Sequence, residues 1–473
     1  MANNPSKVYW MNDRAFGFAE ATQNKAIKVL RDAGIATLFK PGDTVGIKIH
    51  TGEYGNSMNI RPQFVNCVVD EVKRLGGKPV IVECTTTTMG DTCSRATEAD
   101  ILWSANKNGI NEESMGCPIW ICDGKYGYDD VQVPVPHGIF LKHSFMGKKL
   151  LDLDAIIVVS HFKGHPSGVF GGAIKNVGIG MGSKRGKLST HYMNHPDIGY
   201  PAAVVHQDKV QSLVDKGLMD VFLKTCPFDC YSYENGELRF DKSKCTGCGC
   251  CYSLFRWGGV ITQPYEGVYI RPFPISDSAA AFINAIGPEK MMYLNYAIDI
   301  SPWRDCTPWH DRPMIPNVGV FASKDPVAVD MACLEACDSM DVVPGSQAVE
   351  MGFTKPGEEK FTNVSSPFKI SQWYMINSAI YNGIGSSEYV LVESEPVEDD
   401  TDLGPLGYSQ YRPAASCYRE AWQANKDWDP HDPWYEKQKL SFDELAVRPK
   451  GKIEDISIKD EQRENAKIKF GEK

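Results

Sequence analysis

Four cysteines lie within seven residues, in the stretch CTGCGCC that runs from Cys245 to Cys251. Cys245, Cys248 and Cys251 keep the Cys-x-x-Cys-x-x-Cys spacing of ferredoxin-type iron–sulfur sites, whereas Cys250 breaks it. The fourth ligand is expected at the upstream pair Cys226-Pro, because in ferredoxin-like folds a Cys-Pro cysteine binds the cluster that the other motif holds. We therefore predict one 4Fe-4S cluster with four cysteine ligands, namely Cys226, Cys245, Cys248 and Cys251.

The stretch between the two cysteine segments contains YSYENGELRF, whose Asn-Gly pair predicts a hairpin over residues 231–240. Such a hairpin would bring Cys226 toward the later cysteines. Lys216, Met219 and Phe222 stand where a second cluster motif would have its ligands, so we expect a single cluster. Four thiolates also suit a structural zinc ion, which is the alternative, but the Cys-Pro ligand favours iron–sulfur.

A second set of reactive side chains follows the apolar run LLDLDAIIVVS, which we predict to be a buried strand ending at Ser160. The segment SHFKGHPSGVFGGAIKNVGIGMGSKRGKLSTH, residues 160–191, then combines histidines and lysines with many glycines. Glycines let a backbone approach an anion, lysines supply positive charge, and open α/β sheets bind ligands beyond the carboxyl ends of their strands. The candidate catalytic residues of this segment are His161, Lys163, His165, Lys175 and His191.

The ends of two other predicted strands add polar side chains at the same edge of a parallel sheet. His50 and Glu53 follow the strand in VGIKIH, and Glu83 ends the strand KPVIVE. The candidate binding residues for a substrate or a second cofactor are His50, Glu53, Gly171, Gly172, Asn176 and Lys187. The glycine-rich segment matches no Walker or Rossmann spacing, so a nucleotide is not implied. A loop that serves only for packing is the alternative.

The Pro- and Trp-rich stretch SPWRDCTPWHDRP is a third candidate. Its residues Asp305, Cys306, His310 and Asp311 are of types that can bind a metal or line the rim of a pocket. An ordinary surface loop is the alternative.

Alternating helices and strands must position these residues. Amphipathic patterns predict helices over residues 21–34 and 61–77, with a strand after each of them. The alternation resumes in MIPNVGVFAS and DPVAVDMACLEA. We therefore expect an α/β fold, a mostly parallel sheet with helices on both faces, an inserted ferredoxin-like module and a C-terminal arm. The expected parts are residues 1–221 and 263–396 for the α/β domain, 222–262 for the module and 397–473 for the arm.

Composition and charge limit the classes of partner that we expect for this 473-residue chain. Its net charge of −10 argues against a nucleic-acid surface as the main function. No run of about 18 apolar residues occurs, so no membrane span is expected, and the start of the chain has no export signal. Fifteen scattered cysteines, an odd number, are typical of a reducing cytoplasm rather than of a disulfide framework. The acidic, Trp-rich arm is expected to wrap its own domain or to join a second copy in a homo-oligomer.

The chain resembles the family catalogued as domain of unknown function 362, in its ferredoxin-containing form. The resemblance rests on VGIKIHTGEYGN, on HFKGHPSGVFGGAIKNVGIGMGSKRGKLSTH, on the cysteine module and on VGVFASKDPVAVDMA, over roughly residues 40–340. It implies a cytoplasmic iron–sulfur protein, frequent in anaerobes, with an α/β body and an inserted ferredoxin module.

Two departures from that family are visible. Members commonly have two cluster motifs, so a two-cluster relay is not expected here, and their Cys-Asp-Cys appears as Arg304-Asp305-Cys306. The GG-x-x-K run with a downstream histidine is also similar to the nickel-pincer lactate racemases. That similarity would place Lys175 and His191 near a cofactor.

These observations favour an oxidoreductase in which the cluster passes electrons to or from a small anionic substrate or an organic cofactor. The lysines of residues 160–191 would bind the anionic group, and the histidines would donate protons. A redox partner protein would complete the electron path. Two alternatives stay open. One is an electron carrier or binding protein without chemistry of its own, and the other is a non-redox lyase or isomerase with a metal or covalently bound cofactor near Lys175 and His191.

Overall fold

The computed structural model describes residues 5–87, 94–166, 168–192, 203–245, 251, 258–262, 270–366, 369–396 and 423. The chain divides into two units, Met1–Gly407 and Tyr408–Lys473. Apart from Gln423, the predicted C-terminal arm, residues 397–473, lies outside the described residues, so its role stays a prediction. Cys248 and Cys250 of the cysteine motif lie outside them as well, as does the side chain of His191.

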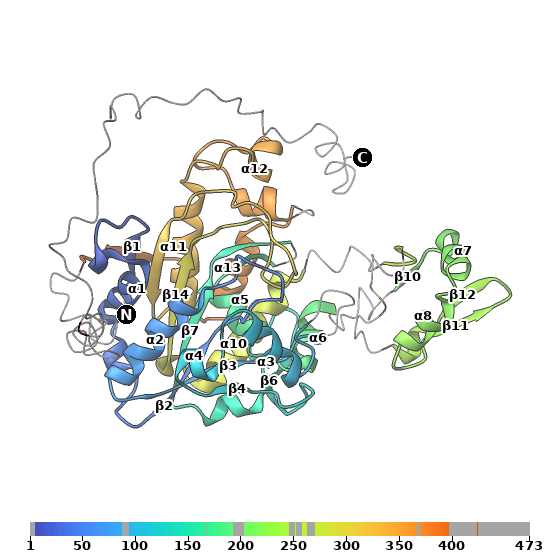
Figure 1. The fold of residues 1–473 in the computed structure, drawn as a ribbon, viewed down its shortest axis with the longest axis horizontal. Helices are drawn as coiled ribbons and strands as arrows, with labels where there is room; N and C mark the ends of the chain where they lie inside the picture. Colours follow the sequence, from blue (N-terminus) through green and yellow to red (C-terminus); the bar gives the residue numbers. More distant parts are fainter. Residues whose placement is uncertain are drawn as a thin grey trace. The chain divides into compact units, whose positions relative to one another are not determined.

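A mostly parallel sheet of eight strands forms the centre of the described part of the first unit (Figure 1). From one edge to the other its strands are β16 (Tyr389–Glu393), β1 (Ser6–Asn12), β15 (Gly319–Ser323), β14 (Met291–Ala297), β7 (Ala155–His161), β2 (Thr44–Lys48), β3 (Lys78–Glu83) and β4 (Ile119–Ile121). β15 runs antiparallel to both of its neighbours, and every other neighbouring pair is parallel. The predicted α/β fold with a mostly parallel sheet is therefore confirmed.

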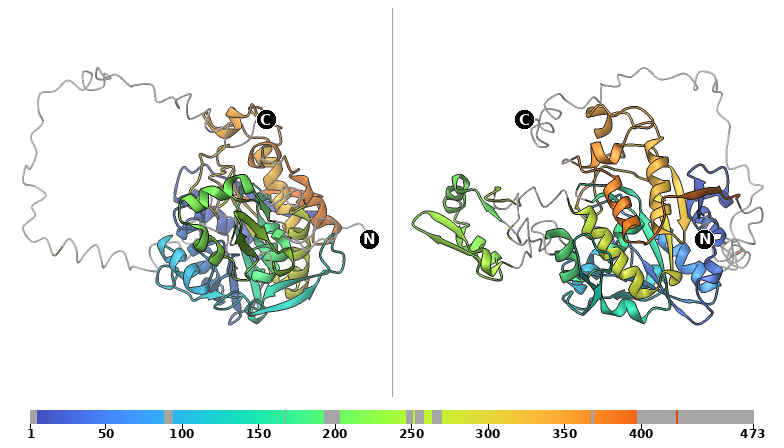
Figure 2. Two further views of the ribbon diagram at one scale, coloured as in Figure 1. Left: turned by 90° about the vertical axis from the view of Figure 1, so that its right-hand side faces the viewer. Right: turned by 180° about the vertical axis from the view of Figure 1, so that it is seen from behind.

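Helices cover both faces of this sheet, as the alternating pattern predicts. α1 (Thr22–Asp32) and α2 (Pro62–Arg74) belong to the apolar cluster that contains Ile157 of β7. α5 (Ala173–Gly178), α10 (Pro272–Ile286), α11 (Pro326–Asp338) and α13 (Trp373–Tyr381) belong to the cluster that contains Ile156 and Val158. Successive residues of β7 enter opposite clusters because neighbouring strand residues point to opposite faces. Figure 2 shows the sheet and its helices from two further sides.

Shorter elements complete the described residues. Besides two helices of the cysteine module, the other described helices are α3 (Glu98–Lys107), α4 (Glu112–Met115), α6 (Lys184–Tyr192) and α12 (Gln347–Glu350). Short 3-10 or π turns lie at Phe18–Glu20, Ile35–Thr37, Lys148–Asp152, Lys242–Lys244, Pro288–Lys290 and Phe361–Ser365. Two hairpins pair β5 (Asp130–Pro134) with β6 (His143–Gly147) and β8 (Lys163–His165) with β9 (Val169–Gly171). None of the described helices has the length and apolar character that a membrane span requires.

The cysteine module has an apolar cluster of its own. It comprises β10 (Val204–Val205), α7 (Gln207–Asp215), α8 (Met219–Thr225), β11 (Tyr231–Glu234), β12 (Glu237–Phe240) and β13 (Ile261–Thr262). β11 and β12 form the predicted hairpin, and Asn235 and Gly236 at its turn both have positive φ, as a type I′ turn requires. Val210 and Leu213 of α7 pack into the same cluster, while the bounds 222–262 of the module stay a prediction.

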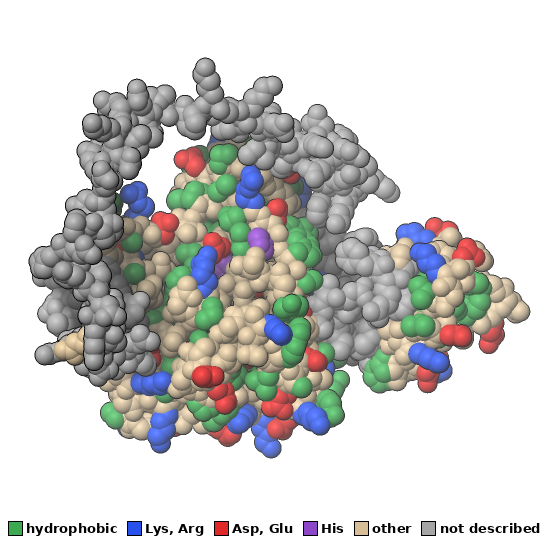
Figure 3. Space-filling view, in the orientation of Figure 1, with side chains coloured by type: hydrophobic (Ala, Val, Ile, Leu, Met, Phe, Trp, Pro, Cys, Tyr) green, Lys and Arg blue, Asp and Glu red, His purple; other side chains and the backbone are tan. Residues whose placement is uncertain are grey.

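The described surface mixes charges of both signs. On the face drawn in Figure 3, basic and acidic side chains are interspersed among apolar and uncharged ones.

Candidate active site

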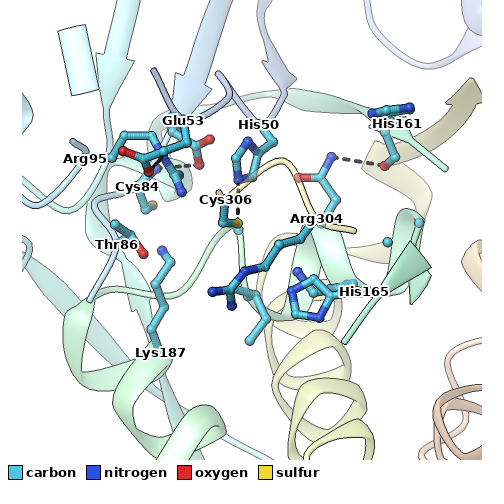
Figure 4. Close-up of a pocket in the computed structure, with 18 of the residues that line it drawn as sticks. His50, Glu53, Cys84, Thr86, Arg95, His161, His165, Lys187, Arg304 and Cys306 are labelled. Atoms are coloured by element: carbon cyan, nitrogen blue, oxygen red, sulfur yellow. Dashed lines mark hydrogen bonds and ion pairs between the residues drawn. The ribbon is translucent and has the colours of Figure 1, made fainter. Parts of the chain in front are cut away.

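The carboxyl ends of β2, β3 and β7 meet at one edge of the sheet, because these strands are parallel neighbours. A partly open pocket lies at this edge. Ten of the residues that the sequence analysis selected line it: His50, Glu53, His161, Lys163, His165, Gly171, Gly172, Lys175, Asn176 and Lys187. Figure 4 shows how several of them lie around the cavity. The selected segments, far apart in sequence, therefore form one site.

The start of α5 is fixed by a buried carboxyl group of α11. Asp330 Oδ1 accepts from the backbone N–H of Ala173 at 2.7 Å, and Oδ2 accepts from that of Ile174 at 2.9 Å. Burial raises the pKa of Asp330 to about 7. A Cβ on Gly172 would lie 2.4 Å from Asp330 Oδ1, so this glycine permits the close contact. The contact sets the direction of the helix that carries Lys175.

Lys175 lines the pocket, and no described residue forms a hydrogen bond or an ion pair with its amine. Burial lowers the pKa of this amine from 10.5 to about 8, and the positive charges of Lys163 and Arg304 add to the effect, while Cys306 opposes it. An amine with such a pKa exchanges its proton near neutral pH. Lys175 therefore has the properties of a proton-transfer group or of a nucleophile.

Cys306 lies against His50, with 3.0 Å between Sγ and Nε2. The backbone N–H of Gly52 donates to Nδ1 of the same ring at 2.9 Å, so the ring proton is on Nε2 and faces the sulfur. Burial holds the pKa of His50 well below its usual value, which keeps the ring neutral. Burial also acts to raise the pKa of the Cys306 thiol, but positive charges led by Arg95 and Lys175 outweigh it and lower this pKa. The surroundings therefore favour a thiolate.

His161 and Lys163 both contact the buried carboxylate of Asp305. Lys163 Nζ donates to Asp305 Oδ2 at 2.6 Å, and His161 Nδ1 lies 3.1 Å from the same oxygen. The second ring nitrogen of His161 lies 2.8 Å from the carbonyl oxygen of Ile298, so both nitrogens face acceptors. Burial acts to raise the pKa of Asp305, but Lys163 and His161 outweigh it and hold this pKa well below the usual range. The ring of His161 lies at the margin of the pocket (Figure 4), and the catalytic roles predicted for both residues stay predictions.

Two further acidic side chains of the pocket are paired with cations. Glu53 Oε2 lies 3.2 Å from Arg95 Nε, and Glu83 Oε1 accepts from Lys48 Nζ at 2.8 Å. Lys48 also donates to Asn176 Oδ1 at 3.2 Å, while the amide nitrogen of Asn176 donates to a backbone carbonyl of β7 at 3.0 Å. Asn176 therefore ties α5 to the sheet.

The remaining selected residues differ in their surroundings. Lys187 donates to the carbonyl oxygen of Gly182 at 2.5 Å, and burial lowers the pKa of its amine. His165 accepts at Nδ1 from the backbone N–H of Gly168 at 2.9 Å, which leaves its proton on Nε2. His310, from the third candidate stretch, contacts Ser57 Oγ at 2.5 Å and does not line the pocket.

The charges of the pocket leave an excess of cations. Each acidic side chain named above, Glu53, Glu83 or Asp305, has a cation of its own. Lys175 and Arg304 have no carboxylate partner among the described residues, and Nε of Arg304 is buried without a hydrogen-bond partner. A small anion bound near these two side chains would be attracted by both of them, in addition to the charge of a Cys306 thiolate.

Sequence reasoning did not select three cations of the site, Lys48, Arg95 and Arg304. Arg304 had a signal, since it directly precedes two selected residues, Asp305 and Cys306. Lys48 is the last residue of β2, but the predicted strand ran on to His50 and so placed Lys48 in its interior. Arg95 follows the end of β3 only at a distance along the chain, so the strand-end rule did not select it.

Three of the four predicted cluster ligands, Cys226, Cys245 and Cys251, are described, and they pack partly buried against the apolar cluster of the module. Cys230 lies among them, because its backbone N–H donates to Cys226 Sγ at 3.4 Å and the nearby Cys226 and Cys245 help burial to raise the pKa of its thiol. No group of three or more His, Cys, Asp and Glu residues forms a metal site within the described part of the chain, which omits Cys248. As donors, thiols gathered on one apolar cluster suit iron–sulfur or zinc.

Comparison with known proteins adds two findings. No curated protein matches the chain. A solved structure, the lactate racemase apoprotein from Thermoanaerobacterium thermosaccharolyticum, is similar at 11% sequence identity and a TM-score of 0.34, over 72% of this chain and 59% of that chain. This chain thus spans about three fifths of the length of that protein.

A comparison with family models identifies the family of this chain. The model described as Domain of unknown function (DUF362) matches residues 45–335, which include all three strand ends that form the pocket. Because the match covers more than half of the 473 residues, the chain belongs to the DUF362 family.

Proposed function

We propose that this protein is an iron–sulfur oxidoreductase that binds a small anionic substrate or organic cofactor in the pocket, where Lys175 transfers a proton. The observation that carries this proposal is the amine of Lys175, which has a pKa of about 8 and no partner among the described residues. A partly buried cation without a partner is costly for a fold, so its presence in a pocket supports a role with a ligand.

Anion binding follows from the same charges. Lys175 and Arg304 lack carboxylate partners among the described residues, whereas the acidic side chains nearby are paired. A planar guanidinium group suits a carboxylate or a phosphate, which it can bind through two hydrogen bonds. Arg304 would therefore orient the anionic group, and Lys175 would face the reacting atom.

Proton transfer is the step that the chain's own residues perform. A group with a pKa near the working pH both gives and takes a proton readily, and Lys175 meets this condition. His165, with its proton on Nε2, is a second donor that lines the same pocket. His161 is held by two acceptors and serves the site by positioning Lys163 and Asp305.

A 4Fe-4S cluster, when bound by Cys226, Cys245, Cys248 and Cys251, would supply or accept single electrons. The gathering of Cys226, Cys230 and Cys245 in the module supports such a site. A redox partner protein is part of this proposal, as is a cytoplasmic location.

A non-redox isomerase or lyase is the second candidate. It is favoured by the fact that Lys175 and His165 can move protons without any electron donor. Measurements of iron content and of cluster reoxidation by the substrate distinguish the oxidoreductase from the isomerase or lyase. After removal of the cluster, an isomerase would keep its rate of substrate turnover, whereas an oxidoreductase would lose its activity.

The pocket is tested with small anions. Purified protein would be titrated with acetate, oxalate, phosphate and glyoxylate, and its melting temperature would be measured. A ligand at about 100 times its Kd stabilises the folded state by roughly 2.7 kcal/mol. We expect Lys175→Met and Arg304→Gln each to weaken the best anion by about tenfold or more.

Lys142→Met is the matched control, because Lys142 is exposed and does not line the pocket. It should leave anion affinity unchanged. If no anion raises the melting temperature, or if Lys175→Met binds the anion as the wild-type protein does, the proposed site is wrong.

A further inference from the structure

We infer that Cys306 is a thiolate nucleophile that adds to the carbonyl carbon of a small aldehyde or ketone carrying a negative charge. This inference rests on the proposed function, since it uses the same pocket and the same cations, and it specifies the substrate class. Four features of the pocket carry it: the ring of His50, the charges around the sulfur, the position of the sulfur and the proton on Lys175.

His50 acts on the sulfur as a hydrogen-bond donor. Its Nδ1 already accepts from the backbone N–H of Gly52 at 2.9 Å, so the proton on Nε2 faces Cys306 Sγ at 3.0 Å. A ring in this tautomer cannot take the thiol proton through Nε2. It can only stabilise negative charge on the sulfur, which favours the thiolate over the thiol.

Nearby positive charges, rather than a general base, favour the thiolate form of Cys306. Arg95, Lys175 and Arg304 act together against burial and lower the pKa of Cys306. Burial raises the pKa of Cys67 to about 12 and that of Cys117 to about 11, where the single cation Lys73 opposes burial without outweighing it. The contrast marks Cys306 as reactive, because the thiolate is the nucleophilic form of cysteine.

The sulfur is also placed where a ligand can reach it. Cys306 lines the pocket and is partly exposed. In Figure 4 its sulfur lies between the ring of His50 and the side chain of Arg304. An anionic group held by Arg304 would therefore put the neighbouring carbon of a short substrate close to the sulfur.

The step balances without an added oxidant or reductant. The thiolate of Cys306 forms an S–C bond with the carbonyl carbon, and the electron pair of the C=O π bond moves to the oxygen. The resulting alkoxide takes the proton of the Lys175 ammonium group, which leaves a thiohemiacetal and a neutral amine. Before the addition, the charge on Cys306 favours the protonated form of Lys175, so both groups are held in the form that reacts.

The reactivity of the sulfur can be measured without knowing the substrate. The full-length protein, purified without oxygen, would be treated with iodoacetamide or iodoacetate at pH 7.5, and modified peptides would be quantified by mass spectrometry. Cys306 should react faster than Cys117, because nearby cations lower the pKa of Cys306 while burial raises that of Cys117 to about 11. The anionic reagent should be favoured at Cys306, and Arg304→Gln should remove that preference.

The carbonyl addition is tested with ¹³C-labelled glyoxylate as the probe. A new carbon signal of a thiohemiacetal is expected in the wild-type protein and not in Cys306→Ser. Borohydride would not fix this adduct to the protein. If borohydride instead attaches the probe to Lys175, the nucleophile is the amine and the inference is wrong.

The outcomes separate this inference from the proposed function. If small anions stabilise the protein but Cys306 alkylates no faster than Cys117, only the nucleophile is wrong. If Cys306 is reactive but no anion binds and iodoacetate is not favoured, the anion site is wrong, and the carbonyl substrate is wrong with it. The alkylation rates come from the wild-type protein, so they do not depend on how well a variant folds.

Discussion

Lys163 Nζ lies 2.6 Å from Oδ2 of Asp305, and the two side chains are only 8% and 4% exposed. The same carboxylate oxygen lies 3.1 Å from Nδ1 of His161. The pair joins β8, which follows β7, to the loop that follows β14. Because a buried charge that loses its partner cannot recover its hydration, this pair is a structural requirement of the pocket as well as a part of its charge.

Replacing Lys163 by methionine should therefore destabilise the fold. We expect Lys163→Met to lower the free energy of unfolding by about 3 kcal/mol, because it leaves Asp305 buried without its lysine and with His161 as its remaining side-chain partner. Urea unfolding monitored by circular dichroism would measure this. Lys28→Met is the control, since its pair with Asp32 is about one quarter exposed, and it should cost roughly 0.5 kcal/mol.

The double variant gives a further check. Lys163→Met with Asp305→Asn removes both charges, so its loss of stability should be smaller than the sum of the two single losses. Additive losses would mean that the two side chains do not interact in solution as they do in the structure.

Stability should rise with pH through the titration of Lys175. Its folded pKa of about 8 lies below the value of about 10.4 for an unfolded lysine, so the unfolded chain binds more protons between these pH values. Below about pH 8 Lys175 is charged in the folded protein, and burial of this charge costs its full free energy. This cost disappears as the pH rises to about 10.5, because the amine then loses its proton. The relief is of the order of 3 kcal/mol.

Lys175→Met should lack this part of the pH dependence and should be more stable than the wild-type protein at pH 7. Urea unfolding at pH 7.5, 9 and 10.5 would measure the difference between the two proteins. Lys142→Met, with an exposed lysine replaced, should keep the wild-type slope. Equal slopes for Lys175→Met and wild type would show that the amine is not buried.

The sequence was sufficient to predict the fold and most of the members of the pocket. Alternation of apolar runs with amphipathic helices identified β2, β3 and β7, and the rule for parallel sheets brought their ends together. His50, Lys163 and Lys175 were selected in this way, although more than a hundred residues separate the first from the other two. Strand ends are visible in a sequence because burial on both faces leaves a continuous apolar run.

What each residue does inside the pocket could not be predicted in the same way. His161 and Lys163 have the residue types of catalytic groups, yet both are held by Asp305. Cys306 appeared as a rim residue, and its charge state depends on Arg95 and Lys175, which are far away in sequence. Pairing and tautomers depend on distances of about 3 Å across the fold, and no local pattern encodes them.

The glycine before α5 should not tolerate a side chain. Gly172 has an extended backbone, with φ near −160°, so alanine would cause no backbone strain there. Its Cβ would lie 2.4 Å from Oδ1 of Asp330, which accepts from the first N–H groups of α5. Gly172→Ala should therefore cost about 1–3 kcal/mol and should displace Lys175 from the pocket.

Thermal unfolding and anion affinity would both be measured for Gly172→Ala. Gly17→Ala is the control, because nothing lies within 4 Å of the place that a Cβ would take there, and it should change stability by about 0.5 kcal/mol or less. A stable Gly172→Ala protein with unchanged anion affinity would contradict the role given to this close contact.

Iron content should depend on Cys226 and not on Cys250. Cys226 lies beside Cys230 and Cys245 in the module, where it is the predicted fourth ligand, whereas Cys250 breaks the ligand spacing. We expect anaerobically purified wild-type protein and Cys250→Ser to contain about four irons per chain and to give the paramagnetic resonance signal of a reduced 4Fe-4S cluster. Cys226→Ser should lose most of the iron, since one ligand position would be left to a weaker donor.

Cys230→Ser tests whether Cys226 or Cys230 is the fourth ligand. Loss of iron in Cys230→Ser, with iron retained in Cys226→Ser, would identify Cys230 as that ligand. Zinc in place of iron in the wild-type protein would contradict the oxidoreductase and leave the isomerase or lyase as the function to test at Lys175.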